Sequence, residues 1–150
     1  MDSADILSMS RSDLRLFVLE FGEREFRGNQ IFSWIHQHCV TDFTQMTTLP
    51  KTFRDMLDSK AILQLPFVVD TSESSETASL KFLFELSDGM KIESVFLPEG
   101  KRRTICLSSQ VGCPLDCRFC ATGRMGLLRN LTTGQIIDQV TRVINNLACL

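Results

Sequence analysis

Four cysteines lie within fifteen residues in the last third of this 150-residue chain, and they constrain its fold more than any other feature. Cys106, Cys113, Cys117 and Cys120 form this group, whereas the other two cysteines stand alone. The last three have the spacing C-x3-C-x2-C, and residues 110–130 around them contain three glycines and no hydrophobic period. The pattern predicts a structured loop whose thiols wrap one metal centre, rather than a helix or a strand.

The composition is that of a globular chain. Hydrophobic residues make up 43% and charged residues 23%, and the formal net charge is −2; these values exclude a disordered or collagen-like chain. No run approaches the ~20 apolar residues that a membrane helix needs. Met1 is followed by Asp2 and Asp5 rather than by a basic and then an apolar segment. We therefore expect no secretory signal, no membrane partner and a cytoplasmic location, where cysteines rarely form disulfides.

Residues 1–62 predict a small helical accessory domain. Capping signals indicate three short helices, which begin at Ser12-Asp13, at Asn29 and at Thr48 with Pro50. Apolar residues at helical spacing follow each signal: Leu14, Phe17, Val18 and Phe21; Ile31, Phe32, Ile35 and Cys39; Phe53, Met56 and Leu57. The basic side chains of this region could contact RNA or form an ordinary solvated face: Arg24, Arg27, Lys51 and Arg54.

Residues 63–100 change to the spacing of strands and predict a β-hairpin that links two domains. Leu80, Phe82, Phe84 and Leu86 alternate with other residues, and the alternation resumes at Met90 after a Ser-Asp-Gly turn. The polar stretch 71–79 predicts an exposed loop.

Residues 101–150 predict a strand at Arg103–Ser108, then the cysteine loop, then a helix. Thr132 and Gln135 form a capping box before an apolar helical stripe. One βα unit cannot bury both of its faces. We therefore expect an α/β fold in which this region is the incomplete start of a larger domain.

Three thiols on one loop favour an iron–sulfur cluster over zinc. A structural zinc site normally takes four ligands, and the histidines lie far upstream. A [4Fe–4S] cluster held by three cysteines leaves one iron open to an external ligand. Two alternatives stay open: a zinc-stabilised RNA-binding module, and a redox protein in which Cys106 is the fourth ligand of an ordinary cluster.

The motif C-x3-C-x2-C with Phe119 before its last cysteine resembles the cluster motif of radical S-adenosylmethionine (SAM) enzymes. The flanking sequences sharpen this to the RlmN-type 23S rRNA adenine-C2 methyltransferases: Cys106-Leu-Ser-Ser-Gln-Val-Gly, Arg129-Asn-Leu-Thr-Thr-Gly, Ile92-Glu-Ser-Val and Leu97-Pro-Glu. The helical segment supports the resemblance through Phe26-Arg27, Gln30-Ile-Phe, Trp34-Ile, Asp42-Phe, Met46-Thr and Leu49-Pro50. Pro114 stands where the family often has Ala, and Gln135 where many relatives have Glu.

This resemblance implies a fold, cofactors and partners. The fold would be a truncated, partial (β/α)6 radical SAM barrel after the accessory domain. The cofactors would be a [4Fe–4S] cluster and SAM, and the partners 23S rRNA, tRNA and an electron donor such as flavodoxin. The reaction would methylate C2 of an adenine in 23S rRNA and of one in the tRNA anticodon loop, through a methylated cysteine and a protein–RNA crosslink.

The resemblance also implies residue roles. Cys113, Cys117 and Cys120 match the cluster ligands, and Phe119 would lie against the adenine moiety of SAM. Cys106 matches the cysteine that resolves the crosslink, and Glu93 matches the base that accepts the C2 proton.

A near relative methylates C8 of the same adenine and confers antibiotic resistance, and the present residues leave that alternative open. We expect the methyl-carrying cysteine and a Gly-Glu motif for SAM beyond residue 150, and the 150-residue chain alone to be inactive. Residues 101–130 carry six basic side chains and one acidic side chain, a net charge of +5. We expect this charge to surround the cysteine loop and to favour RNA.

Overall fold

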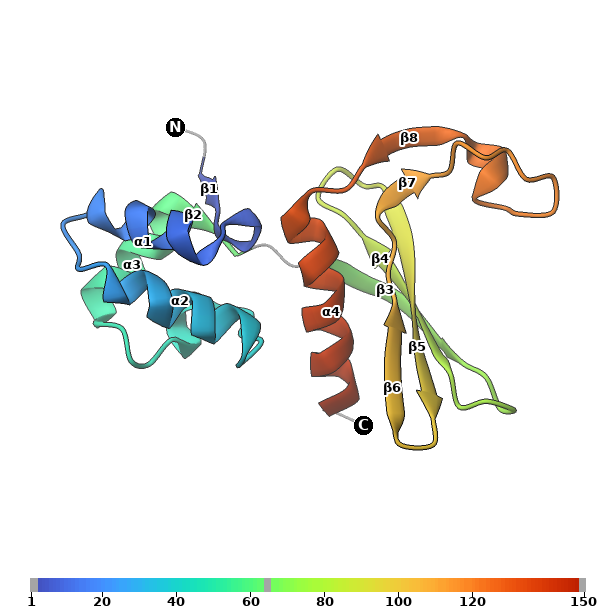
Figure 1. The fold of residues 1–150 in the computed structure, drawn as a ribbon, viewed down its shortest axis with the longest axis horizontal. Coiled ribbons are helices and arrows are strands. Elements are labelled where there is room, and N and C mark those ends of the chain that lie inside the picture. The colour runs from blue at the N-terminus through green and yellow to red at the C-terminus, as the bar shows by residue number, and fades with distance from the viewer. Residues whose placement is uncertain (1–2, 64–65, 149–150) are drawn as a thin grey trace. The chain divides into compact units, whose positions relative to one another are not determined.

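The computed structural model describes residues 3–63 and 66–148, and the chain divides into two compact units that meet in sequence near residue 65 (Figure 1). The N-terminal unit is mainly helical. The second unit contains a sheet, a two-stranded hairpin and one long helix. None of the helices in the described ranges is long and apolar enough to cross a membrane.

Three helices form the N-terminal unit: α1 (Arg11–Leu19), α2 (Phe26–His36) and α3 (Lys51–Lys60). Two short strands, β1 (Ala4–Asp5) and β2 (Ala61–Ile62), pair in parallel, and two 3-10 turns complete the unit, η1 (Ile6–Ser8) and η2 (Phe43–Gln45). The core includes residues predicted for each helix face: Leu14, Phe17, Val18, Ile31, Ile35, Phe53 and Leu57. The three predicted amphipathic helices are therefore confirmed.

The predicted cap of the first helix, Ser12 or Asp13, is wrong. Helix α1 is capped by Ser10, whose hydroxyl oxygen accepts a hydrogen bond from the Asp13 amide at 3.2 Å. The Asp13 carboxylate in turn accepts from the Ser10 amide at 2.9 Å. Asp13 is thus the third residue of a capping box rather than the cap, and Ser12 lies inside the helix.

Helix α2 begins three residues before Asn29, which was expected to cap it. Gly28 lies inside the helix where α2 contacts α1. A Cβ atom at Gly28 would lie 2.6 Å from the backbone nitrogen of Arg15, closer than any side chain permits. Gly28 therefore allows two helix backbones to approach closely.

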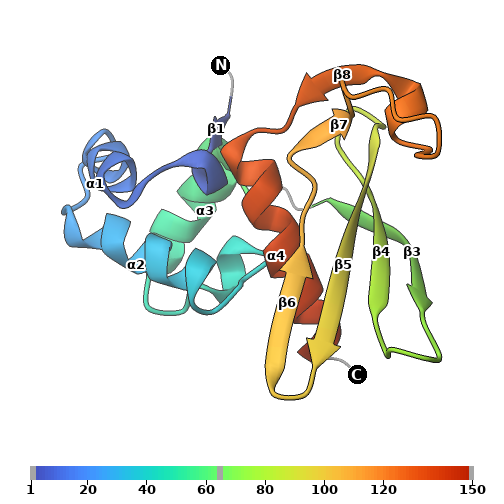
Figure 2. The ribbon, with the colours of Figure 1, turned by 45° about the vertical axis from the view of Figure 1, so that its right-hand side comes forward.

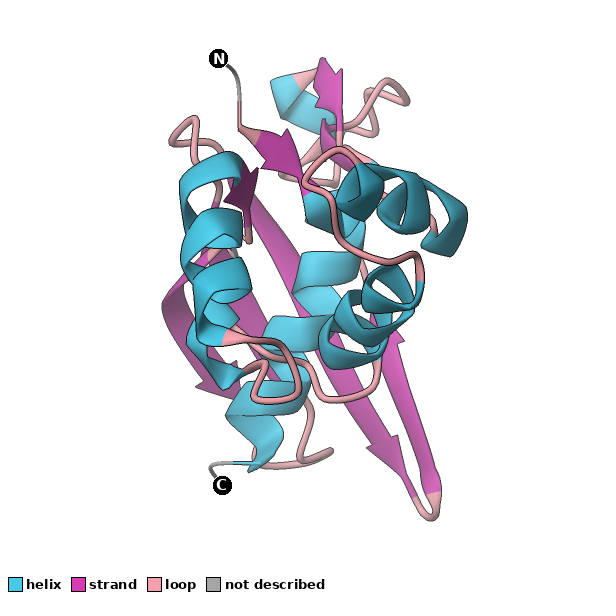
Figure 3. Cartoon of the chain, turned by 90° about the vertical axis from the view of Figure 1, so that its left-hand side faces the viewer, coloured by secondary structure: helices cyan, strands magenta, loops and turns pink. Residues whose placement is uncertain are grey.

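The second unit is built on a four-stranded antiparallel sheet with the order β3-β4-β5-β6. Its strands are β3 (Phe67–Glu73), β4 (Leu80–Glu85), β5 (Lys91–Glu99) and β6 (Arg102–Cys106). Strands β4 and β5 form the predicted hairpin, and its turn contains Gly89 at φ +79°. Figure 3 shows the tight turn that joins β5 to β6. Strand β6 continues the same sheet, so the predicted hairpin and the strand expected at 103–108 belong to one layer.

Helix α4 (Thr133–Ala148) covers one face of this sheet (Figure 2). The shared core contains Phe82 and Phe84 from β4, Phe96 from β5 and Val143 from α4. The predicted capping box precedes the helix. The Gln135 amide donates to the Thr132 hydroxyl at 3.2 Å, and the Thr132 amide donates to the Gln135 side chain at 3.2 Å.

Two stretches expected to be loops contain strands. The stretch predicted as an exposed loop at 71–79 begins as strand, because β3 extends to Glu73 and pairs with β4. The cysteine stretch is bounded by β7 (Gln110–Gly112) and β8 (Leu127–Asn130), which pair with each other and flank the short 3-10 turn η3 (Gly123–Met125). In β3 and β8 most side chains are exposed, so these strands lack the hydrophobic alternation that reveals a strand in a sequence, and β7 has only three residues.

Candidate functional site

Glu93 and Cys106 lie on the same face of the sheet, the face that α4 leaves open. Cys106 stands directly opposite Val95 in the ladder between β5 and β6, and opposite residues of an antiparallel pair share a face. Glu93 is two residues from Val95 and therefore points to that face as well. Both side chains are exposed. Diagonal neighbours in such a ladder are about 7–8 Å apart, so the two groups can act on one substrate.

A third functional side chain, that of Lys81, lies on this open face. Lys81 stands opposite Val95 on the other side, from β4, and its Nζ lies 3.1 Å from Oε1 of Glu93. Both side chains are about half exposed, so the ion pair orients the carboxylate more than it stabilises the fold. The open face thus presents an ammonium, a carboxylate and a thiol on three adjacent strands.

The cysteine loop is closed at its base by β7 and β8. The Cys113 amide donates to the carbonyl oxygen of Gly126 at 3.0 Å, and the Cys120 amide donates to the carbonyl of Cys117 at 3.0 Å. Gly112 has φ +77°, and a Cβ atom there would lie 1.8 Å from the Gly126 carbonyl oxygen. Only glycine fits at this base, and the loop therefore starts and ends at fixed points.

The three predicted ligand thiols are partly accessible and free of disulfides. Cys113, Cys117 and Cys120 are half-buried, and Cys106 is exposed. Within the part of the chain that the structure describes, no three side chains of His, Cys, Asp or Glu are grouped closely enough to hold a metal ion. The donor set still fits an iron–sulfur cluster, because three free thiols lie on one loop whose ends are fixed. Binding would require the thiols to gather.

Phe119 is 94% exposed at the tip of this loop. Other large apolar side chains of the loop and of β8 are exposed with it: Leu115, Met125, Leu127 and Leu128. An apolar group so exposed contributes little to the stability of this unit, and it is available to a ligand or to another part of a protein.

The basic residues of 101–130 do not form one group around the loop. Lys101, Arg102 and Arg103 lie at the turn between β5 and β6, which is at the opposite end of β6 from the cysteine loop (Figure 1). Arg129, on β8, donates to Asp88 in the β4–β5 turn through Nε at 2.9 Å and to Gln135 at 2.9 Å. The expectation that all six charges surround the loop is therefore wrong, because the strand separates them.

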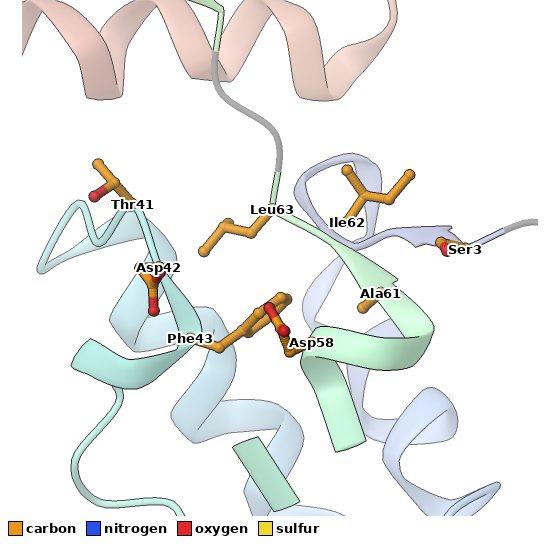
Figure 4. A pocket seen from close by; sticks show the side chains of 8 residues that line it. All are labelled: Ser3, Thr41, Asp42, Phe43, Asp58, Ala61, Ile62 and Leu63. Atoms are coloured by element: carbon orange, nitrogen blue, oxygen red, sulfur yellow. The ribbon is translucent and has the colours of Figure 1, made fainter. Parts of the chain in front are cut away.

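The N-terminal unit contains an open cavity of about 410 Å³ (Figure 4). Its lining combines two carboxylates with apolar and small polar side chains: Ser3, Thr41, Asp42, Phe43, Asp58, Ala61, Ile62 and Leu63. Hydrogen bonds from the side chain and backbone of Thr44 hold the pKa of Asp42 below its usual value, so this carboxylate serves to cap η2. The predicted site residues all lie elsewhere, between Glu93 and Cys120.

Sequence reasoning missed a buried polar network behind the open face. Gln139 of α4 is fully buried and bonds to Ser94 on β5 and to Ser108 after β6. The only available signal was a polar residue within the apolar stripe of the helix.

Comparisons with known proteins show which family the chain resembles. Residues 4–63 match the model of the ribosomal RNA large subunit methyltransferase N-terminal domain. The chain is 46% identical over 136 residues to the dual-specificity RNA methyltransferase RlmN of Saccharophagus degradans, and 41% over 139 residues to that of Marinobacter nauticus. These alignments cover 91% and 93% of this chain. Over these residues, the chain is similar to proteins of the RlmN family.

A solved structure is similar to the chain in fold as well as in sequence. The chain resembles the crystal structure of a radical SAM methyltransferase from Sphaerobacter thermophilus, with a TM-score of 0.89 and 34% identity over 97% of this chain. The match covers 42% of that protein, and the chain spans about a third of the length of its curated relatives. The resemblance predicted from the motifs is confirmed.

Proposed function

We propose that this chain is the N-terminal part of a radical SAM enzyme that methylates C2 of an adenine in 23S rRNA and of an adenine in the tRNA anticodon loop. The observation that carries the proposal is the C-x3-C-x2-C loop of a chain similar to proteins of the RlmN family. The name of these relatives, dual-specificity RNA methyltransferase, supports an RNA substrate. An rRNA substrate also implies a cytoplasmic location.

Cys113, Cys117 and Cys120 would hold a [4Fe–4S] cluster through three of its irons. When bound, the cluster supplies one electron to SAM for radical chemistry, drawn from a donor such as flavodoxin. Strands β7 and β8 fix the two ends of the cysteine loop, which restricts the positions at which the three thiolates can bind one cluster. Phe119 offers an apolar ring next to Cys120, which suits contact with the adenine of SAM. We expect Phe119→Ala to leave stability unchanged, because the ring is almost fully exposed, and to weaken SAM binding.

Glu93 would accept the C2 proton from the methylated adenine adduct, and Cys106 would help to resolve the protein–RNA crosslink. Both residues face the same open side of the sheet, which supports their action on one base. The Nζ atom of Lys81, 3.1 Å from Oε1 of Glu93, orients the carboxylate on this face, as a proton acceptor requires. The negative charge of the Glu93 carboxylate would also stabilise a cationic adduct placed next to it.

The architecture that we propose for the whole enzyme is a partial (β/α)6 barrel that begins at residue 101, after the accessory domain 1–62 and the hairpin region 63–100. Strand β6 is at the edge of its sheet, so one side of its backbone has no strand partner within the described residues. Helix α4 lies against the same sheet. A further strand after α4 could pair with β6 in parallel, which is the usual βαβ arrangement.

The experiment is anaerobic reconstitution of this chain with iron and sulfide. We expect about four irons and four sulfides per chain, and loss of binding when Cys113, Cys117 or Cys120 is changed to Ser. Cys39→Ala, a cysteine outside the loop, is the matched control and should bind as the wild type does. Cys106→Ala should also retain the cluster; loss of the cluster in that variant would instead indicate an ordinary four-cysteine redox site. A product that contains zinc alone would refute the proposal and support a zinc-stabilised RNA-binding module.

The position of the methyl group needs a separate measurement. Mass spectrometry of rRNA modified by an enzyme of full family length should locate the methyl group at C2 of the adenine. A methyl group at C8 would assign the chain to the antibiotic-resistance type of the same family. The same measurement on tRNA tests the second substrate.

A further inference from the structure

Gln139 is a fully buried amide in the middle of helix α4. The helix packs on the sheet through apolar residues such as Val143, one turn later. A buried amide is favourable only when its donors and acceptors are satisfied, because desolvation otherwise destabilises the fold. Its partners therefore show why a polar side chain stands at this position.

All four hydrogen-bonding positions of the Gln139 amide have partners. Its Oε1 accepts from the Ser94 hydroxyl at 2.8 Å and from the Ser108 backbone amide at 2.9 Å. Its Nε2 donates to the Ser108 carbonyl at 2.9 Å and to the Gln135 carbonyl of the same helix at 3.1 Å. The side chain thus binds both backbone groups of Ser108 and ties them to β5 and to α4.

Ser108 completes the connection to the open face of the sheet. Its hydroxyl donates to the carbonyl oxygen of Glu93 at 2.7 Å, so its hydroxyl, its backbone amide and its carbonyl all have partners. Ser94 follows Glu93 directly, and Ser108 lies two residues after Cys106 and five before Cys113. One amide therefore holds the neighbours of the proposed base, the proposed resolving thiol and the first cluster ligand.

We propose that Gln139 is a positioning residue that fixes Glu93, Cys106 and the start of the cysteine loop relative to one another. This inference rests on the proposed function, because it assigns the network a task in that reaction. Packing alone does not require the amide: an apolar side chain of similar size would fill the same space. A fully satisfied buried network instead specifies one arrangement of the segments that it joins.

The test uses an enzyme of full family length that carries this sequence. Gln139→Met keeps the length of the side chain and removes all four hydrogen bonds. Gln139→Glu keeps the two acceptor interactions and loses both donors. Val143→Ala is the matched control, because it removes buried apolar atoms from the same helix one turn away and removes no hydrogen bond. SAM, reductant and RNA are held at saturation, and 5′-deoxyadenosine and methylated RNA are both counted.

We expect Gln139→Met to raise the ratio of 5′-deoxyadenosine to methylated RNA by about tenfold or more, since small misplacements of reacting groups have effects of this size. Gln139→Glu should raise the ratio at least as much, because its second carboxylate oxygen replaces the donating Nε2 and would face the carbonyl oxygens of Ser108 and Gln135 in a buried position. Val143→Ala should lower the melting temperature but leave the ratio unchanged. If Gln139→Met lowers both products in parallel, as an unstable protein does, the amide is only structural and the proposal is wrong.

A second measurement separates this proposal from the proposed function. In the 150-residue chain, hydrogen–deuterium exchange at residues 108–113 should become faster in Gln139→Met than in Val143→Ala at equal folded fraction. Equal exchange in the two variants would overturn the positioning role. A wild-type enzyme that makes neither product would refute the proposed function, while the exchange measurement still decides whether Gln139 holds this segment.

Discussion

Replacement of Gly112 by alanine tests whether the base of the cysteine loop has a single allowed geometry. Gly112 has φ +77°, and an added Cβ would lie 1.8 Å from the carbonyl oxygen of Gly126. Real Cβ atoms essentially never come closer than 3.0 Å to such an atom, so the two strands must separate by at least 1.2 Å. That carbonyl accepts the hydrogen bond from the Cys113 amide, and the bond cannot survive such a shift.

The magnitude follows from two effects. A non-glycine residue in the left-handed region costs about 1–2 kcal/mol, and a lost backbone hydrogen bond costs about 0.5–1.5 kcal/mol. We therefore expect Gly112→Ala to lower the free energy of unfolding by roughly 1.5–3.5 kcal/mol. Gly89→Ala is the matched control: Gly89 has φ +79°, but nothing lies within 4 Å of its added Cβ. Gly89→Ala should lower the free energy of unfolding only by the cost of a non-glycine residue in the left-handed region, about 1–2 kcal/mol.

Urea unfolding followed by circular dichroism measures both variants, and iron content after anaerobic reconstitution measures the loop. Gly112→Ala should unfold at a lower urea concentration than Gly89→Ala and should bind less iron, because Cys113 follows the displaced residue. Gly89→Ala should bind iron as the wild type does. Equal stability of the two variants would show that the close approach to Gly126 has no energetic consequence, and the reasoning would be refuted.

Three further predictions concern the rest of the fold. Gly28→Ala should separate α1 from α2, since its Cβ would lie 2.6 Å from the Arg15 backbone; a melting temperature equal to that of an alanine variant at an exposed α2 position would contradict this. A hydrogen bond from the Met90 amide is the largest cause that keeps the pKa of Asp88 below its usual value. Stability from Asp88 is therefore present above its unfolded pKa of about 4 and lost as the pH falls through the lower folded value, and urea unfolding of Asp88→Asn should lack that contribution. Thr132→Ala should remove the cap of α4 and destabilise the second unit by about 1 kcal/mol, with faster amide exchange in the first helical turn as the check.

Short-range patterns predicted the elements of this chain well. The apolar spacing of Leu14, Phe17 and Val18 located α1, and the alternation from Leu80 located the hairpin. The capping box of Thr132 and Gln135 was also predicted, because its two residues are only three apart. The start of α1 was missed because Ser10, Ser12 and Asp13 are all residue types that can cap a helix, and the choice among them depends on the path by which the chain enters the helix.

The candidate site was predictable only in part. The spacing of the three loop cysteines identified residues that share a loop, and the ladder register then placed Glu93 and Cys106 on one face. The network around Gln139 could not be predicted, because its partners Ser108 and Ser94 are 31 and 45 residues away in sequence. Contacts at such distances depend on the assembled sheet and helix, which no local pattern encodes.

The order of strands in the sheet has a consequence for synthesis of the protein on the ribosome. Strands β3 to β6 are neighbours in sequence order, so each can join the sheet as soon as it emerges, and such local pairing is fast. Gln139 lies 31 residues after Ser108 in the sequence and therefore emerges from the ribosome later than Ser108 does. Until Gln139 has emerged, we expect the segment before the cysteine loop to lack the hydrogen bonds that hold it. During this interval the thiols of the loop would be accessible to iron.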